Sequence, residues 1–90
     1  MSYTTVLSAK AMRELDRLDR KIEQRVQSRL DELAANPLDP RISNNLEMSE
    51  GKRYSRVGDW RIVYDIKESE KTLFVITIQH RSRVYKELTK

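Results

Sequence analysis

Hydrophobic and polar residues follow two different spacings along the chain, and the change falls near residue 51. After a short β-branched and aromatic segment at residues 3–7, which predicts a strand, apolar residues recur every three or four positions up to residue 36. That spacing places them on one face of a helix. Beyond residue 51 apolar and polar residues alternate, as in strands with one buried side. The chain is therefore predicted to combine helices with a sheet.

Two helices are predicted in the first part of the chain. Ser8 and Asp19 are suitable N-caps, because their side-chain oxygens can accept a bond from a free backbone N–H. The apolar residues of the two helices are Ala11, Met12, Leu15 and Leu18, then Ile22, Val26, Leu30 and Leu33. Asn36-Pro37 ends the second helix, because a residue before proline avoids the α region. The helices, over about 9–18 and 20–36, are expected to form a hairpin.

Three strands are predicted in the second part, over residues 52–57, 60–67 and 72–80, after an irregular connector. Gly58-Asp59 is a two-residue turn with glycine first, the preference of a type II′ hairpin. The expected fold is α+β: an N-terminal strand, then a two-helix hairpin packed on one face of a mostly antiparallel sheet of about four strands. The order is β-α-α-β-β-β with a short C-terminal tail or helix, in a single domain over residues 1–90.

The two-residue turn fixes which side chains share a face of the sheet. The face predicted to lie under the helices holds Trp60, Ile62, Tyr64 and Ile66, with Phe74, Ile76 and Ile78 from the last strand. Leu73, Val75, Thr77 and Gln79 are assigned to the other side. That uncovered side, called the open face, is predicted to collect Lys52, Tyr54, Arg56, Arg61 and Arg81.

The predicted register sets Arg56 directly opposite Arg61, and like charges in that position destabilise a sheet. One explanation is that Asp59, Asp65 or Glu68 neutralises them, or that the long side chains spread into water. The other explanation is an anion held between them. A guanidinium group is a planar fork that matches phosphate oxygens and stays charged at any working pH.

Charge supports an anionic partner, because the net +4 is unevenly distributed. Residues 1–50 hold 8 Lys and Arg against 9 Asp and Glu, whereas residues 51–90 hold 10 against 5. A one-sided basic excess favours nucleic acid, although a solvated basic surface would look the same. With no cysteine and one histidine, neither disulfides nor a multi-histidine metal site is expected, and no cofactor is predicted. The chain shows no long apolar run and no signal peptide, so a cytoplasmic location without membrane contact is expected.

Two motifs, RVGDWRIVYDI at residues 56–66 and IQHR at residues 78–81, resemble sequences of the RelE-type toxins of the RelE/ParE superfamily. Residues 56–66 read RVGDWRIVYDI, similar to the family signature RVGDYRIIYEI. Residues 78–81 read IQHR and are followed by Val84-Tyr85, similar to the family's closing pattern I-x-H-R-x-x-V-Y. Asn36-Pro37 likewise matches the end of the family's helical hairpin. The resemblance extends over nearly the whole chain, in order and at the expected spacing.

The resemblance implies a toxin of a type II toxin–antitoxin system that cuts messenger RNA in the ribosomal A site and is silenced by an antitoxin protein. It implies a metal-independent endonuclease in which the 2′-hydroxyl of RNA attacks the neighbouring phosphate. Arg61 and Arg81 match the positions that hold the phosphate, and Tyr85 matches the catalytic tyrosine. Tyr54 falls near the first of two basic residues of the family, which is usually lysine, and Arg56 falls near the second.

Other residues are assigned from their charge and place in the sequence. Contacts with RNA are predicted for Lys52, Arg53, Tyr54, Arg83 and Lys86. His80 is a candidate acid or base, since histidine is the usual proton carrier near neutral pH. Strand alternation, however, points His80 away from Arg81, which favours a structural role. Two other functions stay open: a ParE-type toxin that poisons DNA gyrase, and a catalytically degenerate RNA-binding homologue.

Overall fold

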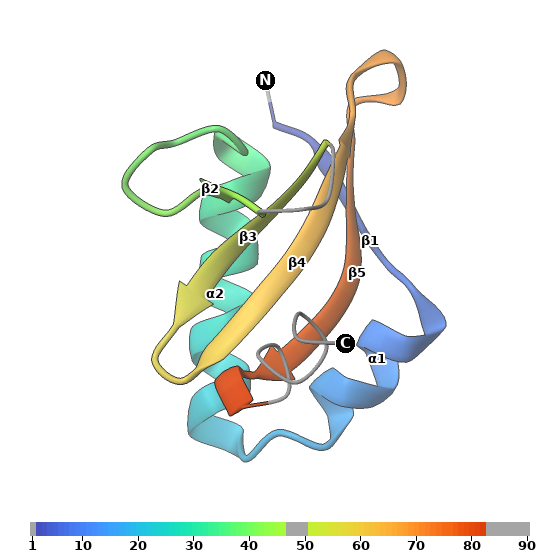
Figure 1. Ribbon diagram of the computed structural model, residues 1–90. Helices are drawn as coiled ribbons and strands as arrows, with labels where there is room; N and C mark the ends of the chain where they lie inside the picture. Colours follow the sequence, from blue (N-terminus) through green and yellow to red (C-terminus); the bar gives the residue numbers. More distant parts are fainter. Residues whose placement is uncertain (1, 47–50, 83–90) are drawn as a thin grey trace.

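The computed structural model describes residues 2–46 and 51–82, which form two helices packed on one face of a five-stranded sheet (Figure 1). In chain order the elements are β1 (Thr4–Leu7), α1 (Ala9–Asp16), α2 (Arg20–Ala35), β2 (Asn44–Asn45), β3 (Lys52–Val57), β4 (Trp60–Lys67), a short 3-10 helix (Glu68–Glu70) and β5 (Thr72–His80). The predicted α+β fold is confirmed. None of the helices in these two ranges is long and apolar enough to cross a membrane.

Both predicted N-caps are present. Ser8 Oγ accepts a hydrogen bond from Ala11 N at 3.0 Å, and Asp19 Oδ1 accepts one from Ile22 N at 3.0 Å. Each bond satisfies a backbone donor that the first turn of a helix leaves without a partner. Helix α1 stops at Asp16, two residues before the predicted end, so the link between the helices is slightly longer than expected.

The strands lie in the order β1-β5-β4-β3-β2. Strand β1 is parallel to β5, and the other neighbours are antiparallel. The register predicted for the β3–β4 hairpin is confirmed, with Val57 opposite Trp60 and Arg56 opposite Arg61. Strand β2 was not predicted, because it is only two residues long and lies within the irregular connector.

The β3–β4 turn has the predicted type II′ geometry. The φ angle is +61° at Gly58 and negative at Asp59. This combination is that of a type II′ turn. A Cβ added at Gly58 would also lie 3.4 Å from a terminal nitrogen of Arg25 on α2. That distance is an ordinary van der Waals contact, so glycine is favoured at position 58 by its backbone conformation and not by the helix beside it.

One prediction about β5 is wrong. Leu73 and Val75 are fully buried in the core, whereas Phe74 and Ile76, predicted to lie under the helices, are outside the core cluster. The cause is a β-bulge: Val63 pairs with Thr77 but Tyr64 pairs with Val75, which leaves Ile76 as an extra residue. An extra residue shifts the alternation of a strand by one position. The side chains before the bulge are therefore reversed, while Ile78 faces the core as predicted.

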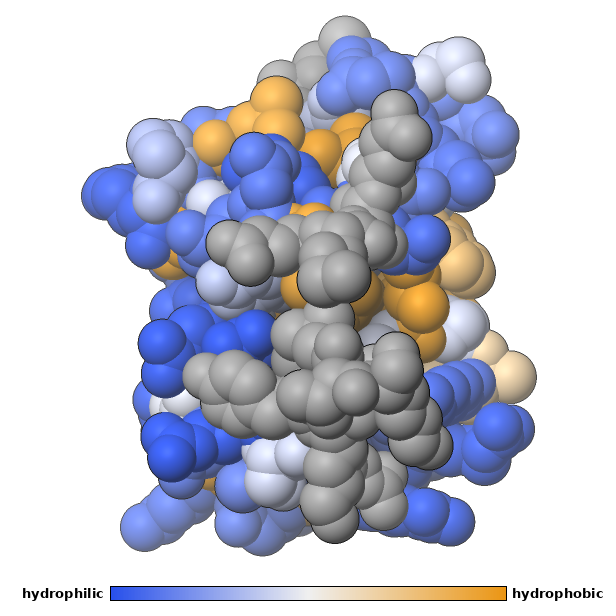
Figure 2. All heavy atoms as spheres, viewed as in Figure 1, coloured by the Kyte–Doolittle hydropathy of each residue, from blue (hydrophilic) through white to orange (hydrophobic). Residues whose placement is uncertain are grey.

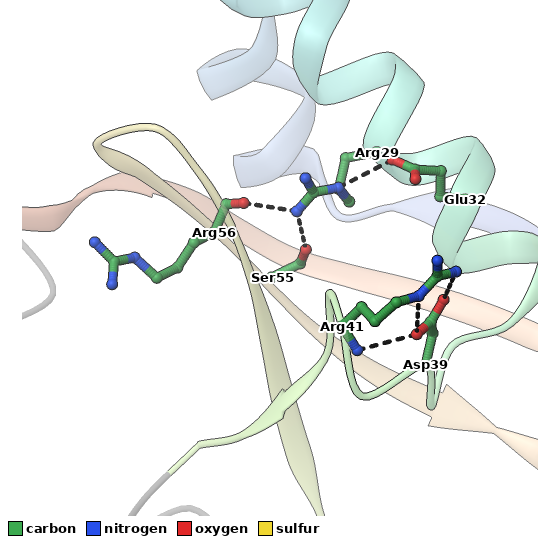
Figure 3. A network of polar contacts seen from close by, with 6 residues as sticks. All are labelled: Arg29, Glu32, Asp39, Arg41, Ser55 and Arg56. Atoms are coloured by element: carbon green, nitrogen blue, oxygen red, sulfur yellow. Dashed lines mark hydrogen bonds and ion pairs between the residues drawn. The ribbon is translucent and has the colours of Figure 1, made fainter.

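Side chains of the helices satisfy backbone groups at both incompletely paired edges of the sheet. Beyond the end of β1, Ser8 Oγ donates to the carbonyl of Ile76 at 2.6 Å, and Glu14 Oε1 accepts from the backbone N–H of Ile78 at 2.9 Å. At the other edge, Arg29 of α2 donates to the carbonyl of Arg56 at 2.6 Å (Figure 3). These bonds link the helices to the strands that carry the predicted site and protect the edges from further strand pairing.

We expect Arg29→Met to lower the free energy of unfolding by about 1 kcal/mol, because two acceptors on β3 lose a charged donor. Arg29 Nη1 also donates to Ser55 Oγ at 2.9 Å, and Ser55 is fully buried. Urea denaturation measures the change. Arg20→Met, at an exposed position of the same helix, is the matched control and should stay within about 0.5 kcal/mol of the parent. Equal stability of the two variants would contradict the assigned role.

The connector between α2 and β3 is held by polar contacts that the sequence did not reveal. Arg41 donates to both carboxylate oxygens of Asp39, at 3.1 and 2.8 Å (Figure 3). These hydrogen bonds lower the pKa of the Asp39 carboxyl below its usual value. Deeper in the molecule, the fully buried Tyr64 donates its hydroxyl to the carbonyl of Pro37 at 2.8 Å and shares a second hydrogen bond with Ser43.

Candidate functional site: the open face of the sheet

Arg56 and Arg61 face each other across β3 and β4 on the side of the sheet away from the helices. The two-residue turn makes the pair that closes it, Val57 and Trp60, the hydrogen-bonded kind. The next pair, Arg56 and Arg61, is therefore of the non-hydrogen-bonded kind, in which side chains are closest. Arg56 is exposed and Arg61 is half-buried. Figure 3 shows the Arg56 side chain pointing away from Arg29 and α2.

Tyr54 lies on the same face and stacks on Arg61. The guanidinium carbon of Arg61 is 4.7 Å from the centre of the Tyr54 ring. Tyr54 is paired with Val63, so it is the diagonal neighbour of Arg61 across the two strands. A cation over an aromatic face at this distance is attracted by the electron-rich ring. The contact brings together two of the residues predicted for the site.

Arg81 lies at the end of β5, beside the β3–β4 turn. Its backbone N–H donates to the carbonyl of Asp59 at 2.7 Å, and its guanidinium is 4.0 Å from the Asp59 carboxylate. Both side chains of this ion pair are more than half exposed, at 58% and 66%, so the pair is weak and an arriving anion can replace the carboxylate. Arg81 is the first residue beyond β5 and has helical backbone, so strand alternation does not fix the side on which it lies; its contacts with Asp59 place it beside the turn.

Of the three carboxylates proposed to neutralise Arg56 and Arg61, Asp59 lies against Arg81 and the other two lie against lysines. Asp65 lies 3.7 Å from Lys67, and Glu68 lies 3.8 Å from Lys71 and accepts a bond from Tyr3. Within the two described ranges, no ion pair is found for the side chain of Arg56. Neutralisation is thus not supported for Arg56, whose exposed side chain fits either extension into water or contact with an anion. Figure 2 shows a strongly hydrophilic surface over the β3–β4 turn and apolar surface toward β5 and β1.

Lys52 and Arg53 are separated from this group. Lys52 is on the open face but pairs with Asp65, four residues before Arg56, or roughly 13 Å along the strand. Arg53 pairs with Tyr64 and so lies on the helical side, where it donates to Ser43 Oγ and Asn45 Oδ1, each at 2.6 Å. The structure therefore assigns Arg53 to the connector network. Its predicted contact with RNA has no support from this position.

His80 lies on the helical side, as strand alternation indicated. It pairs with Trp60, and the two rings are 5.3 Å apart at an interplanar angle of 86°. Its Nδ1 lies 3.1 Å from Ser82 Oγ. Together with residues of α1, His80 lines a pocket of about 270 Å³ between that helix and the sheet. An acid–base role on the open face does not fit this orientation.

Three predicted site residues, Tyr85, Arg83 and Lys86, lie outside the described residues. Across residues 2–46 and 51–82, no three His, Asp or Glu side chains are grouped as a metal site would need. Sequence reasoning missed Arg29, which supports the strand that carries Arg56. The available signal was its spacing, three residues after Val26 and four before Leu33, which places it on the buried side of α2, where an arginine is unusual unless it is paired.

The same fold is found in solved toxin structures. The toxin–antitoxin complex RelBE2 from Mycobacterium tuberculosis matches with a TM-score of 0.77 and 27% identity, over 90% of this chain and 100% of that chain. The archaeal RelE–RelB complex from Pyrococcus horikoshii matches at 0.78 and 21%, over 92% and 99%. The isolated RelE toxin from E. coli matches at 0.78 and 21%, over 98% and 96%.

A comparison with curated protein sequences finds no significant match. The family model described as the ParE toxin of the type II toxin–antitoxin system parDE matches residues 6–85. That span includes both helices, all five strands except the first residues of β1, and the arginines of the open face. The chain therefore belongs to the ParE toxin family of the RelE/ParE superfamily, and it is a toxin of a type II toxin–antitoxin system.

Proposed function

We propose that this toxin is a ribosome-dependent endonuclease that cleaves messenger RNA in the A site and thereby inhibits translation. The observation that carries the proposal is the close pair of arginines, Arg56 and Arg61, on the face that the helices leave open. A like-charged pair costs stability, and the stacking of Arg61 on Tyr54 holds one member in place. A phosphate bound between the two guanidinium groups would attract both of them and so offset their mutual repulsion.

The chemistry proposed is attack of the RNA 2′-hydroxyl on the adjacent phosphate, with departure of the 5′-oxygen of the next nucleotide. The phosphorane that forms carries more negative charge than the substrate. Arg61 and Arg81 would stabilise that charge, with Arg56 as a third donor at the exposed margin. The 2′-hydroxyl loses a proton and the departing 5′-oxygen gains one, and Tyr85 is assigned to one of these two transfers on the strength of the family resemblance. His80 faces Trp60 and has no part in this scheme.

The proposal includes an antitoxin that covers the basic open face. The Mycobacterium tuberculosis and Pyrococcus horikoshii relatives were both solved as complexes with their antitoxins. Residues 51–90 of this chain carry 10 basic and 5 acidic side chains. A partner segment with acidic side chains would complement that excess charge. Co-purification of the toxin with the product of the adjacent gene is the direct test.

The test of the proposed activity is to induce the toxin in growing cells and to map RNA 5′ ends across the transcriptome. We expect new ends within codons of translated messages, and none in the same messages when their start codons are removed. A gyrase poison is the second candidate, because the matching family model is that of a ParE toxin. Broken DNA with intact messages would establish that function instead. Neither effect at high expression would indicate a degenerate RNA-binding homologue.

A further inference from the structure

The open face contains an aromatic ring that is placed to hold one arginine against the repulsion of another. Tyr54 and Arg61 come from neighbouring strands and stack with 4.7 Å between the guanidinium carbon and the ring centre. Arg56, two residues after Tyr54 on β3 and directly opposite Arg61, carries the same charge in the closest kind of cross-strand pair. The Arg61 side chain has many rotamers, and repulsion from Arg56 favours rotamers that turn away from the site. Stacking on the Tyr54 ring favours rotamers that keep the Arg61 guanidinium on the open face.

The ring itself is firmly placed. Tyr54 lies inside the sheet, where β3 is paired on both sides: Tyr54 is opposite Val63 of β4 and opposite Asn44 of β2. Two neighbours in β3 are also fixed by side chains, since Arg53 is bonded to Ser43 and Ser55 is bonded to Arg29. The Tyr54 side chain is half-buried. Because the Tyr54 ring is already fixed, it loses little conformational freedom when the longer Arg61 side chain stacks on it.

We propose that Tyr54 is a positioning residue: its aromatic face pre-orients the Arg61 guanidinium for the scissile phosphate, and its hydroxyl takes no part in proton transfer. The inference rests on the proposed RNA cleavage for its consequence, but the stacking itself can be tested without that activity. Pre-orientation is useful here because a donor held in place before the reaction stabilises the transition state without a cost of reorganisation.

The kinetic test compares Tyr54→Phe with Tyr54→Leu on ribosomes programmed with a defined message. Phenylalanine keeps the ring and leucine removes it. We expect leucine to lower kcat by about fivefold, the rate equivalent of a typical cation–π contact, with KM little changed. Phenylalanine should recover most of that loss. Tyr3→Leu is the matched control, because Tyr3 stacks on Lys71 at 5.2 Å away from the site, and its kcat should equal that of the parent.

Three kinetic outcomes would overturn the proposal. Equal losses for phenylalanine and leucine would assign the effect to the hydroxyl. A rise in KM at constant kcat for leucine would show that Tyr54 binds the RNA, for example by stacking on a base. A leucine variant as fast as the parent would show that the contact has no function.

The second measurement is independent of catalysis. In the full-length toxin labelled with ¹⁵N-arginine, the ring current of Tyr54 should shift the Arg61 Nε–H resonance upfield. The shift should persist in Tyr54→Phe and disappear in Tyr54→Leu. If the shift behaves in this way but the parent cuts no RNA, the stacking is right and the proposed function is wrong. If the parent cuts RNA but the Arg61 resonance is unaffected by the ring, the positioning role is wrong.

Discussion

Replacing Arg61 with alanine is expected to slow RNA cleavage by about 10²–10³-fold, because a single preorganised donor to a transition-state oxyanion typically contributes that much. Arg61 is the best-held arginine of the open face, since it is half-buried and stacks on Tyr54. Lysine at this position keeps the charge but not the planar fork. Arg61→Lys should therefore recover only part of the loss, which separates geometry from charge.

The measurement is the single-turnover rate of message cleavage on purified ribosomes, with growth arrest in cells as a second readout. Arg13→Ala is the matched control, because Arg13 is an exposed arginine of α1 on the helical side of the sheet. It should cleave at the parental rate. Thermal unfolding of each variant reports whether the fold is intact. A folded Arg61→Ala protein with full cleavage activity would refute the site assignment.

The hairpin that carries Arg56 and Arg61 could be predicted because its geometry is local. A two-residue turn with glycine at the first position permits one register, and from that register alternation places each side chain on a face. The same reasoning correctly placed Trp60, Ile62 and Tyr64 toward the helices. Alternation also assigns Arg53 to the helical face, because Arg53 is out of phase with Lys52 and Tyr54. The predicted contact of Arg53 with RNA was therefore at odds with the sequence pattern itself.

The part that failed depends on contacts that are distant in sequence. The bulge at Ile76 occurs where β1 ends and α1 takes over the edge of β5, through Ser8 and Glu14. Nothing in the alternation of residues 72–80 marks that position, because every residue from Leu73 to Ile78 except Thr77 is apolar. A uniformly apolar strand has no phase of its own. The helix that packs on it therefore decides where the phase changes.

The family resemblance identified which residues belong to the candidate site, and the structure showed how they lie relative to one another. The motif around residues 56–66 identified the arginines, and the structure placed Arg56 and Arg61 on one face beside Tyr54. The resemblance marked position 54 only as a departure, since lysine is usual there. The stacking on Arg61 gives tyrosine a physical role at that position. Tyrosine in place of lysine removes one positive charge from the open face and supplies an aromatic ring that holds Arg61 in place.

Tyr64→Phe is expected to lower the free energy of unfolding by about 1–3 kcal/mol, the cost of leaving buried polar groups without partners. The hydrogen bonds run in one direction: Arg53 Nε donates to Ser43, Ser43 donates to the Tyr64 hydroxyl, and that hydroxyl donates to the carbonyl of Pro37. Phenylalanine removes the central member and leaves the Pro37 carbonyl without a donor in a site that water does not reach. Urea denaturation at neutral pH measures the loss. Tyr3→Phe, which removes a hydroxyl bonded to the exposed Glu68, should change stability by less than about 0.5 kcal/mol.

The pH dependence of the same variant provides a second check. Burial raises the pKa of the Tyr64 hydroxyl above its ordinary value, despite the opposing hydrogen bonds from Ser43 and Arg53. In the unfolded chain the phenol ionises near pH 10, while in the folded protein it stays protonated to higher pH. The unfolded state therefore loses its proton first, so the stability that Tyr64 contributes is complete below about pH 10 and declines above it. Phenylalanine cannot ionise, so the stability difference between the parent and Tyr64→Phe should shrink as pH rises from 9 to 11. A difference that grows over that interval would mean that the folded protein prefers the ionised hydroxyl and that the direction assigned to the network is wrong.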